Sequence, residues 1–265
     1  MPLTRYGIQE ACTAHILRSL DATEPRSKPY PHFWSRGFLP EDIYGQMLTS
    51  SPDLDQLGGG GYGSTQRNGE VSRFALNLVR EKMDVMPTDA RELWYGVRDA
   101  VGSLAVKRAV FAKLAHGLAY RFGIHRDQAV DIEAFPQLTL FRETEGYFIK
   151  PHPDTRKKIV TLQIALPADD TQQELGTSMY QLSANPLRLL QEPRGFVEVG
   201  RHPFLPNSVF SFSVINTARL RSWHGRTALP PGCGFRNSLL VVYYANPADA
   251  NAEIVEEQYQ RSRAA

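Results

Sequence analysis

The sequence has little cysteine and no long apolar run. Its two cysteines, Cys12 and Cys233, lie far apart among 265 residues. They exclude a disulfide framework, so we expect a reducing compartment. No run of about 18 apolar residues occurs, and the first fifteen residues lack the apolar core of a signal peptide. We therefore expect a cytoplasmic protein without a membrane-spanning segment.

The sequence also lacks a large excess of charge of either sign. Its net charge is +2 and its pI is near 8.5, although basic residues cluster at 156–158 and 219–221. This balance argues against nucleic acid as a partner. The length and the 42% apolar content favour one globular domain with a real core. They do not set an oligomeric state, for which a homodimer is one alternative.

The hydrophobic period of the chain changes near residue 131. Before it, apolar residues recur at helical spacing over residues 4–20, 39–48 and 88–123. After it, about seven short segments, separated by turns rich in Pro, Gly and Asn, predict β-strands. We expect a single domain of the α+β class with a mainly β core. Residues 1–130 would form its helical support, 131–246 a sandwich or barrel, and 247–265 a polar tail.

A glycine-rich stretch, Gly58–Gly63, interrupts the helical part. Consecutive glycines cannot pack a core and have high backbone entropy, so the stretch predicts a loop. Two interpretations are open, namely a simple surface loop or a lid over an active site.

The strongest chemical signal lies at His152 and Asp154, two residues apart and interleaved with prolines. A residue that precedes proline is pushed toward extended geometry, and alternate residues of an extended chain share a face. A His-x-Asp pair with a distant histidine is typical of a facial triad for a redox-active metal. We expect His224 to be the third ligand. The alternative is a hydrogen-bonded His–Asp pair on a surface loop.

A second signal, Arg236 and Ser238, follows His224 at the start of the apolar stretch 239–244. Their spacing of two predicts that both side chains share a face of a strand. A guanidinium and a hydroxyl placed together can bind one carboxylate. The alternative is an ordinary arginine at a strand end beside a serine in a turn.

Together, His152-Pro153-Asp154, His224 and Arg236-Asn237-Ser238 resemble the motif of the non-haem Fe(II)- and 2-oxoglutarate-dependent oxygenases. The similarity is closest to the prolyl-4-hydroxylase-like branch of that superfamily. It extends over most of residues 30–245. It implies a double-stranded β-helix, or jelly roll, of the cupin-like kind with supporting N-terminal helices.

The resemblance implies that His152, Asp154 and His224 bind Fe(II), and that Arg236 and Ser238 bind the far carboxylate of the co-substrate 2-oxoglutarate. The remaining co-substrate is dioxygen, and no side chain beyond the metal ligands has to act as an acid or a base. Tyr147 and Gln137 could hydrogen-bond the co-substrate from neighbouring strands, or belong to the core and the sheet face.

The implied reaction is hydroxylation of an unactivated C–H bond of a small molecule, such as an amino acid or a natural-product intermediate, with release of succinate and CO2. The retained Asp154 favours hydroxylation over halogenation. Alternatives within the same chemistry are a peptidyl substrate and a desaturation or cyclisation outcome. An alternative of another class is a non-catalytic, metal-binding cupin-like protein.

Overall fold

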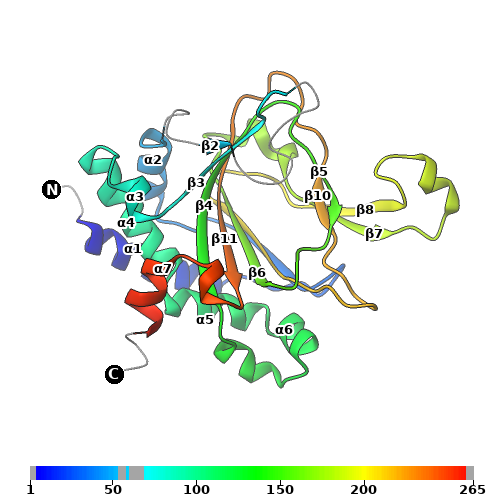
Figure 1. Ribbon diagram of the computed structural model, residues 1–265, viewed down its shortest axis with the longest axis horizontal. Helices are drawn as coiled ribbons and strands as arrows, with labels where there is room; N and C mark the ends of the chain where they lie inside the picture. Colours follow the sequence, from blue (N-terminus) through cyan, green and yellow to red (C-terminus); the bar gives the residue numbers. More distant parts are fainter. Residues whose placement is uncertain (1–3, 53–57, 60–68, 261–265) are drawn as a thin grey trace.

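The computed structural model describes residues 4–52, 58–59 and 69–260. Its helices lie against one face of a large sheet, and a smaller sheet faces the other side of the large one (Figure 1). The helices are α1 (Arg5–Asp21), α2 (Glu41–Thr49), α3 (Arg80–Met83), α4 (Thr88–Val101), α5 (Leu104–Lys113), α6 (Ala115–Phe122) and α7 (Ala252–Ile254). The strands are β1 (His32–Arg36), β2 (Gly58–Gly59), β3 (Arg73–Asn77), β4 (Phe135–Glu143), β5 (Ile149–His152), β6 (Lys158–Ala165), β7 (Ser178–Leu182), β8 (Phe196–Arg201), β9 (Ser208–Ser213), β10 (His224–Arg226) and β11 (Arg236–Tyr244).

The two sheets form a jelly roll. The larger has the order β1-β9-β6-β11-β4-β3-β2 and the smaller the order β5-β10-β7-β8, with antiparallel neighbours throughout. From β4 to β11 the chain passes repeatedly between the sheets, which is the connectivity of a double-stranded β-helix. The predicted fold class is confirmed.

The larger sheet also includes strands from the N-terminal part of the chain, β1 and β3. Strand β3 and the three-residue β10 were not predicted from the sequence. The three-residue β10 is too short to show alternating apolar residues, whereas β3 alternates, with Phe74 and Leu76 on one face, over only five residues. Of the predicted glycine-rich loop, Gly58 and Gly59 form β2 and the rest lies outside the described residues.

In the strands β4, β6 and β11 of the larger sheet, the face toward the helices is apolar. Leu138 and Leu140 on β4 are buried on the side of the helices, as are Leu162 on β6 and Leu239 and Val241 on β11. The intervening residues point to the space between the two sheets because side chains alternate along a strand. The helical layer therefore supplies the core, and the other face is free to carry a polar site.

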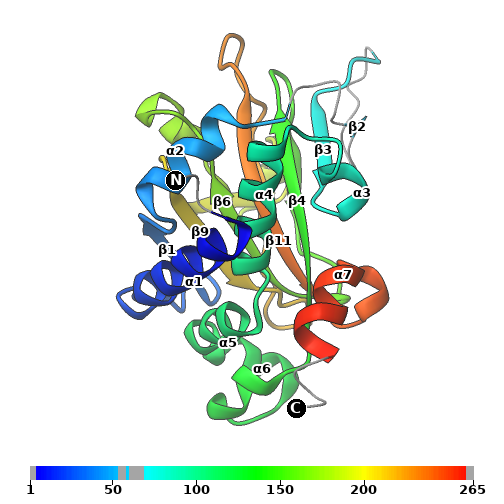
Figure 2. The ribbon, with the colours of Figure 1, turned by 90° about the vertical axis from the view of Figure 1, so that its left-hand side faces the viewer.

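Helices α1 and α4 cross closely in front of this sheet (Figure 2). Gly96 on α4 permits the close approach, because a Cβ atom there would lie 2.6 Å from the Ile8 side chain. The Thr4 hydroxyl caps α1 by accepting a hydrogen bond from the Gly7 amide at 3.3 Å. Cys12 is buried in α1, and both cysteines are free thiols. Among the described helices, none combines the length and apolar character needed to cross a membrane.

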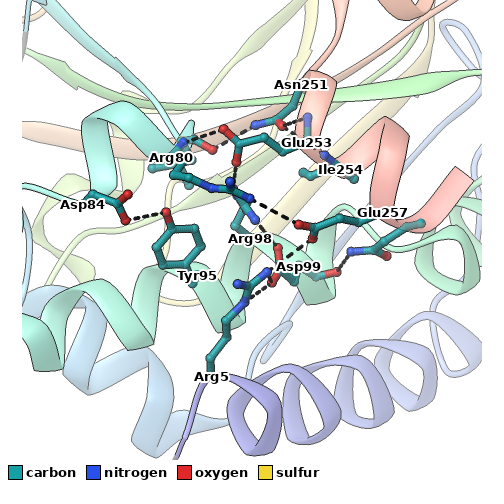
Figure 3. A network of polar contacts seen from close by, with 12 residues as sticks. Arg5, Arg80, Asp84, Tyr95, Arg98, Asp99, Asn251, Glu253, Ile254 and Glu257 are labelled. Atoms are coloured by element: carbon teal, nitrogen blue, oxygen red, sulfur yellow. Dashed lines mark hydrogen bonds and ion pairs between the residues drawn. The ribbon is translucent and has the colours of Figure 1, made fainter.

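An ionic network centred on the buried Arg98 and Asp99 fastens α7 to α1 and α4 (Figure 3). The Arg98 side chain is fully buried, donates from Nε to Asp99 Oδ1 at 2.8 Å and donates from Nη1 to Glu253 Oε2 at 2.6 Å. Arg5 donates from Nε to Asp99 Oδ2 at 2.6 Å and also pairs with Glu257 at 3.4 Å. These contacts join residues from both ends of the described chain.

Removing the Arg98 guanidinium leaves two carboxylates without their buried partner. We expect Arg98→Met to lower the free energy of unfolding by roughly 3 kcal/mol, measured by urea denaturation. The matched control is Arg108→Met, which removes an ion pair with Asp131 whose side chains are 57% and 70% exposed. That change should cost less than about 1 kcal/mol. Equal losses in the two variants would contradict the role given to the network.

Two buried histidines outside the predicted triad, His32 and His202, form a second cluster between the sheets. Their ring centroids lie 5.0 Å apart, and His202 stacks on Trp34 and tilts against Phe210. The Nε2 atoms of both rings are buried and have no hydrogen-bond partner within the described residues. Burial lowers the pKa of His32 and lowers that of His202 to about 4, aided by the nearness of His32.

The lowered pKa of His202 makes stability depend on pH. Between its ordinary value and about 4 the unfolded chain binds a proton that the folded chain does not, so stability falls as pH falls through this window. We expect His202→Phe to reduce the slope of unfolding free energy against pH by up to about 1.4 kcal/mol per pH unit. The exposed His116→Gln should leave the slope unchanged. An unchanged slope in His202→Phe would mean that folding does not lower the pKa of His202.

Candidate metal centre and its cavity

The three residues predicted as metal ligands lie together between β5 and β10. His152 ends β5 and His224 begins β10, and the two are directly paired across the strands with ring centroids 4.3 Å apart. Asp154 follows β5 by two residues. One candidate ligand atom from each of the three residues lies within 4.8 Å of the others. The sequence prediction that these side chains converge agrees with this geometry.

Both imidazoles are held in the orientation that a metal ligand needs. His152 Nδ1 lies 2.9 Å from the Lys150 carbonyl, and His224 Nδ1 lies 2.9 Å from the Ser222 carbonyl. A carbonyl only accepts, so each Nδ1 carries the proton and each Nε2 presents a lone pair. The Nε2 atoms lie 3.9 and 3.8 Å from the oxygens of Asp154. The lone pairs and the carboxylate therefore face a common point.

The protonation states also suit a divalent cation. Asp154 accepts hydrogen bonds from Lys158 Nζ at 2.6 Å and Thr161 Oγ1 at 2.9 Å. Burial opposes its ionisation, but His224 and Lys158 outweigh burial and lower the pKa of Asp154. Burial lowers the pKa of His224, which favours the neutral imidazole. Two imidazoles and one carboxylate on one side fit the facial ligand set of non-haem iron.

Gly225 allows the two ligand strands to lie this close. A Cβ atom at Gly225 would stand 2.7 Å from the Ile149 carbonyl oxygen of β5. Any side chain here would push β10 away from β5 and separate His224 from His152. The glycine next to the predicted ligand therefore has a steric function at the site.

The triad opens into a cavity of about 130 Å³ between the two sheets. Beyond the three ligands, its charged lining consists of Arg73, Glu143, Lys158 and Arg226, and its apolar lining includes Phe210, Phe212 and Leu240. One side of the cavity is thus apolar and another is rich in arginine.

A buried carboxylate, Glu143, organises the arginine-rich side. Its Oε2 lies 2.7 Å from both Arg236 Nη1 and Arg226 Nη2, and its Oε1 lies 3.3 Å from Arg73 Nε. Arg73 and Arg236 are its direct neighbours on the strands at either side, whereas Arg226 comes from the opposite sheet. Burial opposes ionisation, but the three guanidiniums lower the pKa of Glu143. The carboxylate is therefore charged and links the two sheets.

Arg236 and Ser238 share the inner face of β11 with Leu240, as the alternation predicted. Arg236 is fully buried, donates from Nε to the Leu175 carbonyl at 2.7 Å and from Nη2 to Gln163 Oε1 at 3.3 Å, and is not among the residues that line the cavity. Ser238 Oγ accepts a hydrogen bond from Gln163 Nε2 at 3.2 Å. Their predicted contact with a carboxylate stays a prediction.

The two remaining predicted residues differ in position. Tyr147 lines the cavity, where the guanidiniums of Arg73 and Arg226 lie 5.2 and 5.1 Å from its ring centroid. Gln137 is not among the lining residues, and its amide donates to the Leu138 carbonyl at 3.5 Å. It lies on the same face of β4 as Glu143 but six residues away, roughly 20 Å along the strand. The polar lining from a neighbouring strand is instead Gln163 on β6.

Sequence reasoning did not identify Arg73, Glu143 and Arg226 as site residues. For Arg226 a signal was present, because it stands two residues after His224 and alternation places both on one side of a strand. Glu143 follows the predicted strand 137–142 by one residue. Arg73 had no local signal, since β3 was not predicted.

Comparisons with known proteins give likenesses of structure only. No family model matches the chain, and no curated protein matches it. A prolyl-4-hydroxylase from Pseudomonas putida is 13% identical with a TM-score of 0.46, covering 88% of this chain and 98% of that one. A 2OG-Fe(II) oxygenase family oxidoreductase from Burkholderia pseudomallei is 11% identical with a TM-score of 0.44, covering 90% of each chain.

A third solved structure is the alpha ketoglutarate dependent carbocyclase SnoK from nogalamycin biosynthesis. It is 14% identical with a TM-score of 0.44, covering 92% of this chain and 87% of that one. The three structures are of the oxygenase class that the sequence motif resembles. The first, a prolyl-4-hydroxylase, also belongs to the branch that the motif resembles most. Identities this low assign no substrate to this chain.

Each ligand of the triad should be needed for metal binding. We expect His224→Ala and Asp154→Ala to weaken the binding of Mn(II), measured by isothermal titration calorimetry, by more than about tenfold. His202→Phe, which replaces another buried histidine, is the matched control and should bind Mn(II) as the parent does. Binding of parental strength in His224→Ala would show that this histidine is not a ligand.

Proposed function

We propose that the protein is an Fe(II)- and 2-oxoglutarate-dependent dioxygenase that hydroxylates an unactivated C–H bond of a small molecule. The single observation that carries this proposal is the facial set of His152, Asp154 and His224, which opens into a cavity with a cationic side. Fe(II) bound there would supply the activation of dioxygen, with conversion of 2-oxoglutarate to succinate and CO2. The protein contributes binding, orientation and exclusion of water.

The residues around the triad have separate tasks in this proposal. The carbonyls of Lys150 and Ser222 hold the two imidazoles in the metal-binding tautomer, and Thr161 orients the Asp154 carboxylate. The apolar lining keeps water from the reacting C–H bond. Among the described residues, the proposal needs no side chain to act as an acid or a base.

For the co-substrate, the proposal keeps Arg236 and Ser238 as the residues that bind its far carboxylate. Their position on the inner face of β11, beside the cavity residue Leu240, supports it. In the same proposal Tyr147 can donate a hydrogen bond into the cavity, whereas Gln137 is no longer proposed as a contact. The substrate class stays a small molecule. A peptidyl substrate, and a desaturation or cyclisation outcome, would use the same ligands.

An anaerobic optical titration tests the cofactor pair. Fe(II) and then 2-oxoglutarate are added to the apo-protein, with His152→Ala alongside. We expect a weak visible charge-transfer band that appears only after both additions and only in the parent. Metal binding without a band would contradict the proposal and favour the non-catalytic metal-binding protein.

The assignment of Arg236 predicts a specific kinetic effect. We expect Arg236→Ala to raise the 2-oxoglutarate concentration needed for half-maximal succinate formation by about tenfold or more, because a charged contact with a carboxylate is lost. The exposed Arg156→Ala is the control and should not change this concentration. An unchanged requirement in Arg236→Ala would show that the far carboxylate binds elsewhere.

A further inference from the structure

The connection between β7 and β8 gathers exposed apolar side chains, and we call residues 182–199 the arm. Its middle projects away from both sheets (Figure 1, yellow-green). Twelve large apolar side chains are exposed among the described residues, and five of them belong to the arm, namely Leu182, Leu187, Leu189, Leu190 and Val199. The four leucines are between 61% and 83% exposed. An exposed apolar patch of this kind marks a contact with another surface.

The arm has a defined shape, although none of its leucines belongs to the hydrophobic clusters of the described chain. Its middle is a short 3₁₀ helix, Pro186–Leu190, and the Asn185 side chain caps this helix by accepting a hydrogen bond from the Leu187 amide at 3.0 Å. At its base, the Phe196 ring packs edge-on against Trp223 with the ring centroids 4.8 Å apart. A surface that is already ordered loses little entropy when it binds a partner.

The charges of the arm argue against a strongly charged partner. It carries two arginines and two glutamates, so its net charge is zero. Glu192 pairs with Arg194 at 3.2 Å, and Glu198 pairs with Arg201 of β8 at 2.9 Å. Nucleic acid and anionic membranes bind to basic surfaces, which the arm does not offer. A projecting arm also does not enclose a small molecule. A neutral protein surface is the partner that remains.

The edge strand β8 lies at the base of the arm and is open to another strand. It is the outermost strand of the smaller sheet in the described part of the chain, at the opposite edge from β5. Proline and lysine protect natural sheet edges from pairing with other chains. Strand β5 has both, at Lys150 and Pro151, whereas β8 has neither. Two copies of one edge strand can pair antiparallel about a two-fold axis.

We propose that two copies of this chain form a symmetric dimer through the arm. Leu187, Leu189 and Leu190 of one copy pack against the same residues of the other, and the two β8 edges lie side by side. The arm suits a second copy because a neutral apolar patch and an open strand edge are each complementary to themselves. This proposal goes beyond the proposed function and does not depend on it.

The arm and its two strands are large enough for a stable dimer. An interface of standard size takes roughly 20 to 30 residues from each partner. Residues 178–201, from the start of β7 to the end of β8, number 24 (201 − 178 + 1). The dimer therefore needs no contribution from the helical layer.

Sedimentation equilibrium of the full-length protein tests the dimer. The parent should have twice the chain mass of 29.8 kDa. We expect the double variant Leu189→Glu, Leu190→Glu to raise the dissociation constant of the dimer at least about tenfold, because two carboxylates would be buried without partners. The matched control is Tyr6→Glu with Val85→Glu, which adds the same charge at side chains that are 70% and 71% exposed outside the arm. It should dimerise as the parent does.

Hydrogen exchange locates the interface independently of the variants' stability. Backbone amides of residues 182–201 in the parent should exchange more slowly at high than at low protein concentration. In the double variant their exchange should not depend on concentration. An unchanged far-UV circular dichroism spectrum reports that the variant is folded.

Three results would overturn the proposal. The first is a parent that remains a monomer at about 50 µM, where an interface of standard size is occupied. The second is dimerisation of parental strength in the leucine double variant, and the third is equal weakening in the control. A monomeric parent that binds phosphatidylcholine vesicles, and loses this binding in the leucine double variant, would assign the arm to a membrane surface instead.

Discussion

The alternation of side chains along β4, β6 and β11 is the constraint on which the rest of the structure depends. One face of each strand is apolar and packs on the helices, so the opposite face is left for polar groups. A shift of one residue in β4 would bury Glu143 against the helical core, and the same shift in β11 would bury Arg236 there. The register that stabilises the core is therefore the same register that builds the cavity. The same alternation of side chains therefore serves both the stability of the core and the lining of the cavity.

The metal triad could be predicted from the sequence because its geometry is local. His152 and Asp154 lie two residues apart in a stretch that the prolines keep extended, and His224 needed only one strand pairing to join them. Short strands and turns at regular spacing predicted a sandwich or barrel, and the resemblance to the oxygenase motif implied the jelly roll. Helices α1 and α4 were predicted because their buried apolar residues recur at helical spacing, which is also a local feature of the sequence.

The arginine-rich side of the cavity could not be predicted in the same way. The role of Glu143 depends on its ion pairs with Arg73, Arg226 and Arg236. These lie 70, 83 and 93 residues away in the sequence (143 − 73, 226 − 143, 236 − 143). A charged residue at a strand end ordinarily faces solvent, and no local pattern distinguishes a buried one. The same holds for Gln137 and Gln163, because both lie on strands and only the sheet order shows that Gln163 reaches the cavity. Which of these residues line the cavity depends on how distant strands pair, and sequence periodicity does not specify that pairing.

The ionic network around Arg98 has a consequence for how the chain acquires its structure in the cell. Arg5 binds Asp99 on α4 and Glu257 near the other end of the described chain, 252 residues away. Helices α1 and α4 can pack as soon as both have left the ribosome, but this fastening cannot close until residue 257 has also emerged. Domains fold as units during synthesis. The helical layer therefore lacks its ion pairs to Glu253 and Glu257 while the jelly roll is being synthesised. Its last ionic contacts form only after the whole jelly roll has been synthesised.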